Sequence, residues 1–183
     1  MGKIEQKTVT LKDGQTCIIR SAEPSDAKAM LDLTVLIAQT SEYLTLLPTE
    51  VNTTRWKMKS QLSDALQDPI QLRIIAVVEG KTVASLNTFG QKRQRLRHAV
   101  DFGIGIVPDC QGIGLGRILI EQLLVWAREN PTIKRVGLDV DTRNLAAIGL
   151  YEKLGFVREG YHKNTVRYED GSFSDGFTMA QMV

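Results

Sequence analysis

The chain has 183 residues, of which 43% are hydrophobic and 24% charged, a balance that predicts one domain, residues 1–183, with a packed soluble core. Its formal net charge of +2 argues against a nucleic-acid-binding role that rests on overall charge. Cys17 and Cys110 lie far apart and match no metal-binding spacing, so no metal is expected. No signal peptide is visible, and no stretch approaches the ~20 apolar residues of a membrane span. We therefore expect a cytoplasmic protein with no membrane partner.

The N-terminal part of the chain predicts a strand followed by two helices. The strand is expected at Cys17–Arg20, and Ser25 and Asp26 are expected to accept the free N–H groups of the first helix. A second helix is expected at about Thr54–Leu66, because Pro69 follows it closely.

A hairpin and a basic link come next. Residues 71–78 and 82–90 are β-compatible runs joined by Glu79-Gly80-Lys81, which is a hairpin signature. The link at residues 91–98 carries four cations. We interpret it as a solvated loop, and a patch for an acidic partner is the alternative.

The most informative stretch runs from residue 101 to residue 129. Asp101–Val107 is apolar and β-compatible, and Pro108 ends it. Gln111–Arg117 carries three glycines at alternate positions, and apolar residues at helical spacing follow as far as Asn130-Pro131. Glycines let backbone N–H groups approach an anion closely, and a helix N-terminus adds positive charge. A diphosphate is therefore the expected ligand of this loop.

The glycine spacing excludes two common nucleotide sites. A dinucleotide fingerprint needs a glycine where Arg117 stands, and a P-loop needs a lysine that is missing here. What remains is the pattern Gln-x-x-Gly-x-Gly, from Gln111, Gly114 and Gly116. Together with the preceding strand and the following helix, this pattern resembles the GNAT superfamily of acetyl-CoA-dependent N-acetyltransferases. In that superfamily such a loop holds the diphosphate of CoA, and a glycine turn without a ligand is the alternative.

A second segment also resembles this superfamily. From Asn144 to Phe156 the chain matches N-x-x-A-x-x-L-Y-x-K-x-G-F at every position. Asn144 is expected to cap a helix that ends near Leu154, and Gly155 suits its left-handed end. Strands are expected on both sides of this helix. The pattern is similar to bacterial small-amine, polyamine or protein N-terminal acetyltransferases.

The resemblance implies an α+β fold in three layers, α/β/α. Its mixed, mostly antiparallel sheet would split beside the strand that contains Ile104, Gly105 and Ile106, and these residues would bind pantetheine. The Ile106 N–H would face the thioester carbonyl of acetyl-CoA, which is the acetyl donor. The residues that the resemblance implies around the diphosphate are Gln111, Gly112, Ile113, Gly114, Leu115, Gly116 and Arg117.

The resemblance also implies catalytic roles. Asn144 would lie near the pantetheine arm, and Tyr151 would be the general acid at the sulfur. A base is needed because an alkylammonium titrates near ~10.4. Relatives often have a glutamate at the position of Asp101; the aspartate is shorter, so a water relay is expected. A straight strand separates Asp101 from Ile106 by about 16 Å, and a bulge at Gly103 or Gly105 would shorten this path only partly, so Asp101 should act at the amine end.

The acceptor is the part that the sequence specifies least. In this superfamily the stretch between the first two helices shapes the amine pocket, so Glu42 and Tyr43 are candidates, with His98 as a third. Glu42 and His98 also remain alternative bases. The acceptor could be a small amine, a polyamine, an amino acid or a protein N-terminus. Two copies of the chain could form a homodimer. A non-catalytic acyl-CoA-binding module is the alternative function, although Asn144 and Tyr151 favour an enzyme.

Overall fold

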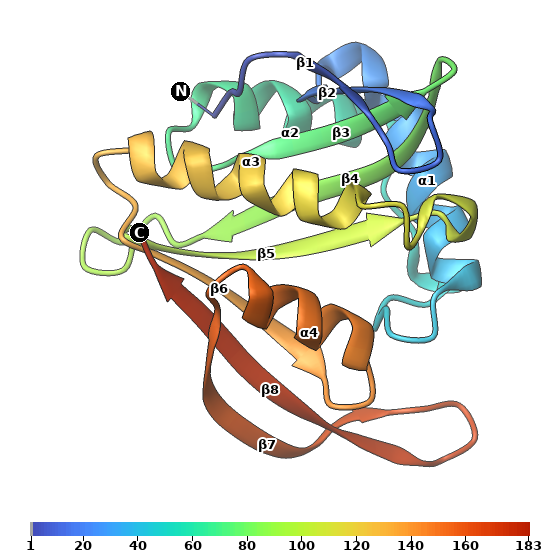
Figure 1. Cartoon of the computed structure of the whole chain (residues 1–183), viewed down its shortest axis with the longest axis vertical. Coiled ribbons are helices and arrows are strands. Elements are labelled where there is room, and N and C mark those ends of the chain that lie inside the picture. The colour runs from blue at the N-terminus through green and yellow to red at the C-terminus, as the bar shows by residue number, and fades with distance from the viewer. Residues whose placement is uncertain (1) are drawn as a thin grey trace.

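The computed structural model describes residues 2–183, which form eight strands and four α-helices. The strands are β1 Lys7–Thr10, β2 Thr16–Ser21, β3 Arg73–Val78, β4 Lys81–Gly90, β5 Ala99–Ile106, β6 Arg135–Asp141, β7 Val157–Arg167 and β8 Phe173–Met182. The α-helices are α1 Ala27–Thr40, α2 Arg55–Gln67, α3 Leu115–Glu129 and α4 Leu145–Lys153. One sheet forms the middle layer, with α3 and α4 in front of it and α1 and α2 behind it (Figure 1).

The sheet is mixed, and it splits between two central strands. Its strand order is β1-β2-β3-β4-β5-β6-β8-β7, and every neighbouring pair is antiparallel except β5 and β6. Within residues 2–183, β5 and β6 pair only from Ala99–Arg135 to Asp101–Gly137. Beyond Asp101 the two strands diverge, as Figure 1 shows. The predicted α+β fold with a split, mostly antiparallel sheet is confirmed.

Side chains of β5 alternate between the two helical layers. A Cβ atom added at Gly105 would lie 2.6 Å from Ile37 of α1. A Cβ atom added at Gly116 of α3 would instead lie 3.4 Å from Ile106. Since neighbouring strand residues point to opposite faces, Phe102 and Ile106 face α3 and α4, whereas Asp101 and Gly105 face α1 and α2.

Several predicted boundaries are confirmed by local geometry. The turn between β3 and β4 consists of Glu79 and Gly80, both at positive φ (48° and 76°). The Thr54 side chain accepts the Lys57 N–H at the start of α2.

No helix within residues 2–183 combines the length and the hydrophobicity that a membrane span requires.

The predicted cap of α1 by Ser25 and Asp26 is wrong. The Asp26 carboxylate bonds to no N–H of α1; it accepts the Glu23 N–H at 2.7 Å and two hydrogen bonds from Arg20 at 2.7 and 2.8 Å. The hydrogen bond from Arg20 also lowers the pKa of Asp26. The carboxylate therefore closes the turn before the helix and binds β2, because a bidentate guanidinium is the stronger partner.

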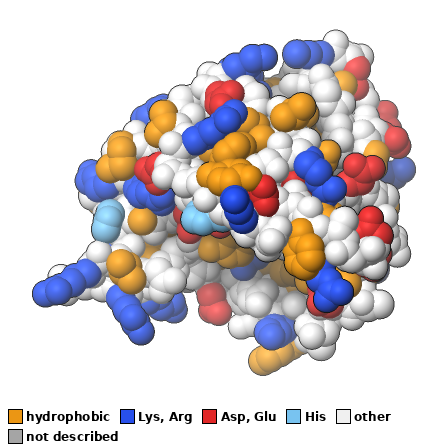
Figure 2. Space-filling view, turned by 90° about the horizontal axis from the view of Figure 1, so that it is seen from below, with side chains coloured by type: hydrophobic (Ala, Val, Ile, Leu, Met, Phe, Trp, Pro, Cys, Tyr) orange, Lys and Arg blue, Asp and Glu red, His pale blue; other side chains and the backbone are white. Residues whose placement is uncertain are grey.

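The surface carries charges of both signs. Figure 2 shows Lys and Arg side chains interspersed with Asp and Glu on the face seen from below, around a hollow that has hydrophobic side chains in its depth. This mixture agrees with the formal net charge of +2.

Candidate active site

The backbone of β5 presents alternate residues to its two neighbouring strands. On one side the Val107 N–H donates to Val83 O at 3.0 Å, so odd-numbered residues bond to β4. On the other side His98 O accepts the Lys134 N–H at 2.8 Å, so even-numbered residues face β6. Both hydrogen bonds therefore indicate that odd-numbered residues of β5 bond to β4 and that even-numbered residues face β6.

This alternation continues through the split. The β4–β5 register runs to Ile106 without a shift, so β5 has no bulge. The parallel pair Asp101–Gly137 uses the Phe102 N–H, so the N–H groups that face the space that β6 leaves open are those of Ile104 and Ile106. The Gln111 side chain reaches back to the same edge, where its Nε2 donates to Ile106 O at 3.0 Å.

The glycine loop follows β5 directly and leads into α3. Gly112 and Gly114 have φ values of 75° and 93°, in the left-handed region that favours glycine. Around Gly112, a Cβ atom would have no neighbour within 4 Å. Its backbone is therefore open to a ligand.

A residue that the sequence did not suggest also contacts this loop. The Lys12 N–H in the β1–β2 turn donates to Ile113 O at 3.2 Å. The Lys12 side chain passes 3.6–3.9 Å from the position of a Cβ atom at Gly114. No sequence signal could have identified Lys12, because the contact depends on the fold of a hairpin about 100 residues earlier.

Tyr151 is buried on the α4 side of the split, with 7% of its surface exposed. Its ring packs edge-on against Phe102 and Phe156, with ring centroids 5.9 Å from each. Burial raises the pKa of Tyr151 to about 12, so the phenol is protonated at neutral pH. Within residues 2–183 its hydroxyl has no hydrogen-bond partner. It is therefore an available proton or hydrogen-bond donor beside Phe102.

Asp101 belongs to the last pair before the split, on the α1 and α2 face. Nη1 of Arg135 lies 3.6 Å from Asp101 Oδ1, and Nη2 of the same side chain pairs with Glu159. A Cβ atom at Gly137 would lie 2.3 Å from Asp101 Oδ1 and 2.6 Å from Arg135 Nη1, so a side chain at position 137 would displace the ends of both side chains. Desolvation raises the pKa of Asp101; Arg135 opposes this effect and Asp139 adds to it.

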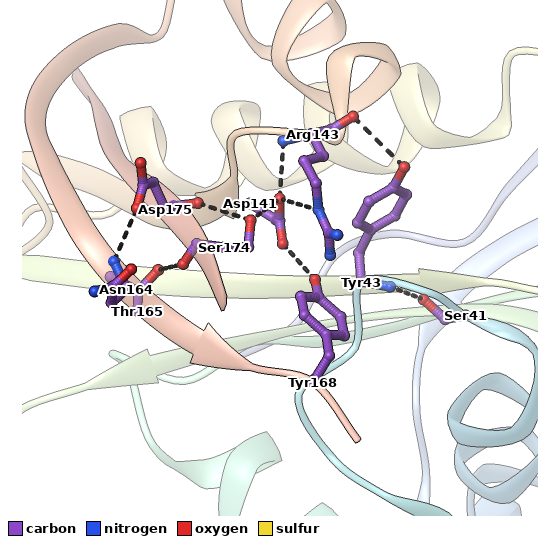
Figure 3. A network of polar contacts seen from close by, with 9 residues as sticks. All are labelled: Ser41, Tyr43, Asp141, Arg143, Asn164, Thr165, Tyr168, Ser174 and Asp175. Carbon is purple, nitrogen blue, oxygen red and sulfur yellow. Dashed lines mark hydrogen bonds and ion pairs between the residues drawn. The ribbon is translucent and has the colours of Figure 1, made fainter. Parts of the chain in front are cut away.

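A pocket of about 470 Å³ lies at the open end of the split. It is formed by the link between α1 and α2, the start of the α4 segment and the β7–β8 turn. Tyr43 bridges two of these segments, because its hydroxyl donates to Arg143 O at 3.5 Å (Figure 3). The residues that line the pocket are Glu42, Tyr43, Arg143, Tyr168, Glu169, Asp170 and Ser172.

Asp141 fixes the inner wall of this pocket. Its buried carboxylate accepts hydrogen bonds from the Arg143 N–H at 2.8 Å, the Ser174 hydroxyl at 2.7 Å and the Tyr168 hydroxyl (Figure 3). Burial would raise the pKa of Asp141, but these hydrogen bonds outweigh it and hold the pKa below its usual value. The Arg143 guanidinium, which also pairs with Asp141, lies 4.1 Å from the centroid of the Tyr168 ring. The sequence did not indicate this network.

The remaining predicted residues lie apart from the pocket or have structural partners. Asn144 Oδ1 accepts the Ala147 N–H at 3.1 Å, which confirms the predicted cap of α4, and Gly155 follows the helix at a φ of 91°. His98 is exposed and precedes Asp101 on the paired side of the split, so the structure does not bring it together with Glu42 and Tyr43. No group of three or more His, Cys, Asp or Glu side chains within residues 2–183 could hold a metal ion.

Comparison with known proteins agrees with this geometry. A model of the acetyltransferase (GNAT) family matches residues 38–156. The chain belongs to this family. The acetyltransferase of the GNAT family from Streptococcus pneumoniae has a structure that matches with a TM-score of 0.89 at 30% identity, over 91% of this chain and 99% of that one. A putative acetyltransferase from Salmonella typhimurium, solved with its cofactor acetyl-CoA, matches with a TM-score of 0.77 at 18% identity, over 90% and 92% of the two chains.

Curated relatives in the GNAT family match over shorter segments. The chain is 28% identical over 110 residues to the L-amino acid N-acetyltransferase AaaT of Escherichia coli, which is 60% of this chain and 67% of that protein. It is 39% identical over 79 residues to the [ribosomal protein bS18]-alanine N-acetyltransferase of Salmonella typhimurium, 41% of this chain and 53% of that protein. It spans only 21% of the mycothiol acetyltransferase of Salinispora arenicola, to which it is 42% identical over 64 residues.

Proposed function

We propose that the chain is an acetyl-CoA-dependent N-acetyltransferase that moves the acetyl group to a primary amine by direct attack in a ternary complex. The observation that carries the proposal is the split after Asp101. Around it lie the unpaired N–H groups of β5, the unpartnered Tyr151 hydroxyl and the glycine loop. The names of the two curated N-acetyltransferases and the acetyl-CoA in a structural neighbour support the same function.

The residues around the split fit acetyl-CoA as the donor, which supplies an activated acetyl thioester. The glycine loop offers open backbone at Gly112 beside the N-terminus of α3, an arrangement suited to a diphosphate. The exposed edge of β5 offers N–H groups to an amide-containing arm such as pantetheine. We assign the diphosphate to residues 111–117 and the arm to Ile104, Gly105, Ile106 and Asn144.

The position of Tyr151 changes where the thioester of acetyl-CoA, which is its reacting end, is expected to lie along β5. Tyr151 packs against Phe102, whereas Ile106 lies four residues further along β5, about 13 Å away in a regular strand. If Tyr151 serves the sulfur, the N–H of Ile104, the first beyond the paired part of β5, is better placed than that of Ile106 to bind the thioester carbonyl. Asp101 is then adjacent to the reacting end, on the opposite face of the strand.

Each residue then has a defined task in amide formation. Asp101 removes a proton from the attacking amine, directly or through one water molecule. A β5 N–H stabilises the negative charge that develops on the carbonyl oxygen. Tyr151 donates to the departing sulfur.

The charge of the pocket supports a cationic acceptor. Arg143 is already paired with Asp141, so Glu42, Glu169 and Asp170 leave the rim of the pocket negative. A protonated amine would be attracted to this rim before it loses its proton deeper in the split. An amino acid, a polyamine and a protein N-terminus all carry such an ammonium group.

Gly114→Asp should weaken acetyl-CoA binding by about tenfold or more, because a carboxylate would oppose the diphosphate. Gly114→Ala is the matched control, since both side chains strain the backbone at a φ of 93° but only one carries charge. Calorimetry measures both affinities. Equal affinities in the two folded variants would contradict the diphosphate assignment.

Arg135→Gln should move the acid limb of the pH profile of kcat/KM to higher pH, by up to about one unit. Arg135 favours ionised Asp101, so its removal raises the pKa of Asp101 further, and the base form is lost at a higher pH as the solution is acidified. Asp139→Asn should move the same limb to lower pH, because Asp139 raises that pKa. If neither variant moves the acid limb, that limb reflects the titration of a group other than Asp101.

One screen tests the proposed function as a whole. Amino acids, polyamines and N-terminal peptides are offered with acetyl-CoA, and CoA release is followed. We expect release with at least one cationic amine. An acyl-CoA-binding module would bind acetyl-CoA yet release no CoA with any acceptor.

A further inference from the structure

Within residues 2–183, Arg73 is a cation without a counter-ion, on the α1 and α2 face of the sheet. Its Nε atom is buried and has no hydrogen-bond partner in the part of the chain that the structure describes. One Nη atom reaches Asn87 Oδ1 at 3.5 Å, the limit of a hydrogen bond, and no carboxylate within residues 2–183 pairs with the guanidinium. Burial accordingly lowers the pKa of Arg73.

Such an arrangement is costly in a folded protein. A buried charge needs a counter-ion or a full set of hydrogen bonds, and replacing one that lacks them with an apolar side chain often raises stability. Asp26 shows the usual solution in this chain, because its carboxylate satisfies Arg20 with two hydrogen bonds. In the part of the chain that the structure describes, Arg73 has no equivalent partner.

A cavity of about 590 Å³ adjoins Arg73, between the C-terminal half of α2 and the first residues of β3. Lys92, from the link after β4, adds a second cation to its wall. The cavity shares no residue with the acidic pocket at the open end of the split. The residues that line it are Gln61, Asp64, Gln67, Asp68, Gln71, Arg73 and Lys92.

The two carboxylates of this cavity do not serve Arg73. Asp68 Oδ1 accepts the Ile70 N–H at 3.0 Å and its Oδ2 accepts the Gln71 Nε2 at 2.8 Å, so both oxygens are held by their own segment. Asp64 is exposed on α2 and forms no ion pair within residues 2–183. Neither carboxylate therefore neutralises Arg73, and its Nη groups, unlike the buried Nε, remain available to an anion from solution.

We propose that this cavity is a binding site for a small carboxylate or phosphate, held by Arg73 and Lys92. A guanidinium binds both kinds of oxyanion through paired N–H groups, and Lys92 adds charge at the mouth. The site is separate from the proposed acetyl transfer and does not depend on it.

Succinate and inorganic phosphate distinguish the two kinds of anion when each is titrated into the full chain at constant ionic strength. Calorimetry and thermal unfolding should show saturable binding of at least one of them, with a rise in Tm. Arg73→Met should weaken this binding at least about tenfold, because the charge-assisted hydrogen bonds are lost. Lys92→Gln should weaken it less, and Asp64→Asn should strengthen it. Lys81→Gln, in the β3–β4 turn outside this cavity, is the matched control and should change nothing.

The stability of Arg73→Met supplies an independent test. Without an added anion its Tm should equal or exceed that of the wild type, because an unpaired buried charge has been removed. A large loss of Tm in the same buffer would overturn the proposal, since Arg73 would then stabilise the fold by itself. Equal responses of wild type and Lys92→Gln to both anions, or a response no larger than that to chloride, would also overturn it.

Discussion

Replacing Tyr151 by phenylalanine should lower kcat by about 10²-fold or more, while the Kd for acetyl-CoA stays the same. The variant keeps the ring that packs against Phe102 and Phe156 and removes only the hydroxyl. Since that hydroxyl has no partner within residues 2–183, its loss should leave the stability of the fold almost unchanged. The effect should therefore appear in turnover alone.

The raised pKa of Tyr151 sharpens this expectation. A phenol with a pKa of about 12 remains protonated through the pH range in which amines are acetylated. Full proton transfer to a CoA thiolate, whose pKa is near ~8.5, is unfavourable unless the site couples the transfer to departure of the sulfur. Tyr151 should thus act mainly by a hydrogen bond to the sulfur, and the alkaline limb of kcat should not titrate with its pKa.

Tyr161→Phe is a matched control for this experiment. Tyr161 lies on β7, is exposed, and donates its hydroxyl to Asp175. The control should retain wild-type kcat with the same acceptor. Wild-type turnover in Tyr151→Phe at saturating acceptor would remove Tyr151 from the mechanism.

The parts of the fold that the sequence predicted well are those encoded by local patterns. The glycine loop specified the strand, turn and helix around it, because Gly112 and Gly114 adopt conformations that other residues rarely tolerate. Asn144 and Gly155 marked the two ends of α4 for similar reasons. In each case a few adjacent residues determine the geometry.

The features that the sequence missed depend on contacts between distant segments. The prediction that Asp26 caps α1 failed because Arg20, on the preceding strand, binds the carboxylate instead. Tyr168 joins the wall of the acidic pocket, held there by Asp141, only after the β7–β8 hairpin folds back on β6. The unpaired state of Arg73 is likewise visible only when its surroundings are known.

Asp101→Asn should lower kcat/KM for the amine by about 10²-fold, while the Kd for acetyl-CoA stays the same. The substitution preserves the size of the side chain and the fit against Gly137, but it removes the charge. If Asp101 mainly holds a cationic amine, the loss should appear as a higher KM for the acceptor. If it removes the proton, kcat should also fall and the acid limb of the wild-type profile should disappear.

Asp32→Asn provides the control, because Asp32 is exposed on α1 and pairs only with Lys28 of its own helix. It should leave acceptor kinetics at wild-type values. Unchanged kinetics and an unchanged pH profile in Asp101→Asn would make Asp101 a plain strand residue. The base would then be sought at Glu42, which lines the acidic pocket, before His98, which lies on the paired side of the split. Glu42→Gln would distinguish these two candidates. If Glu42 is the base, the variant should lose turnover; if His98 is the base, the variant should keep wild-type turnover.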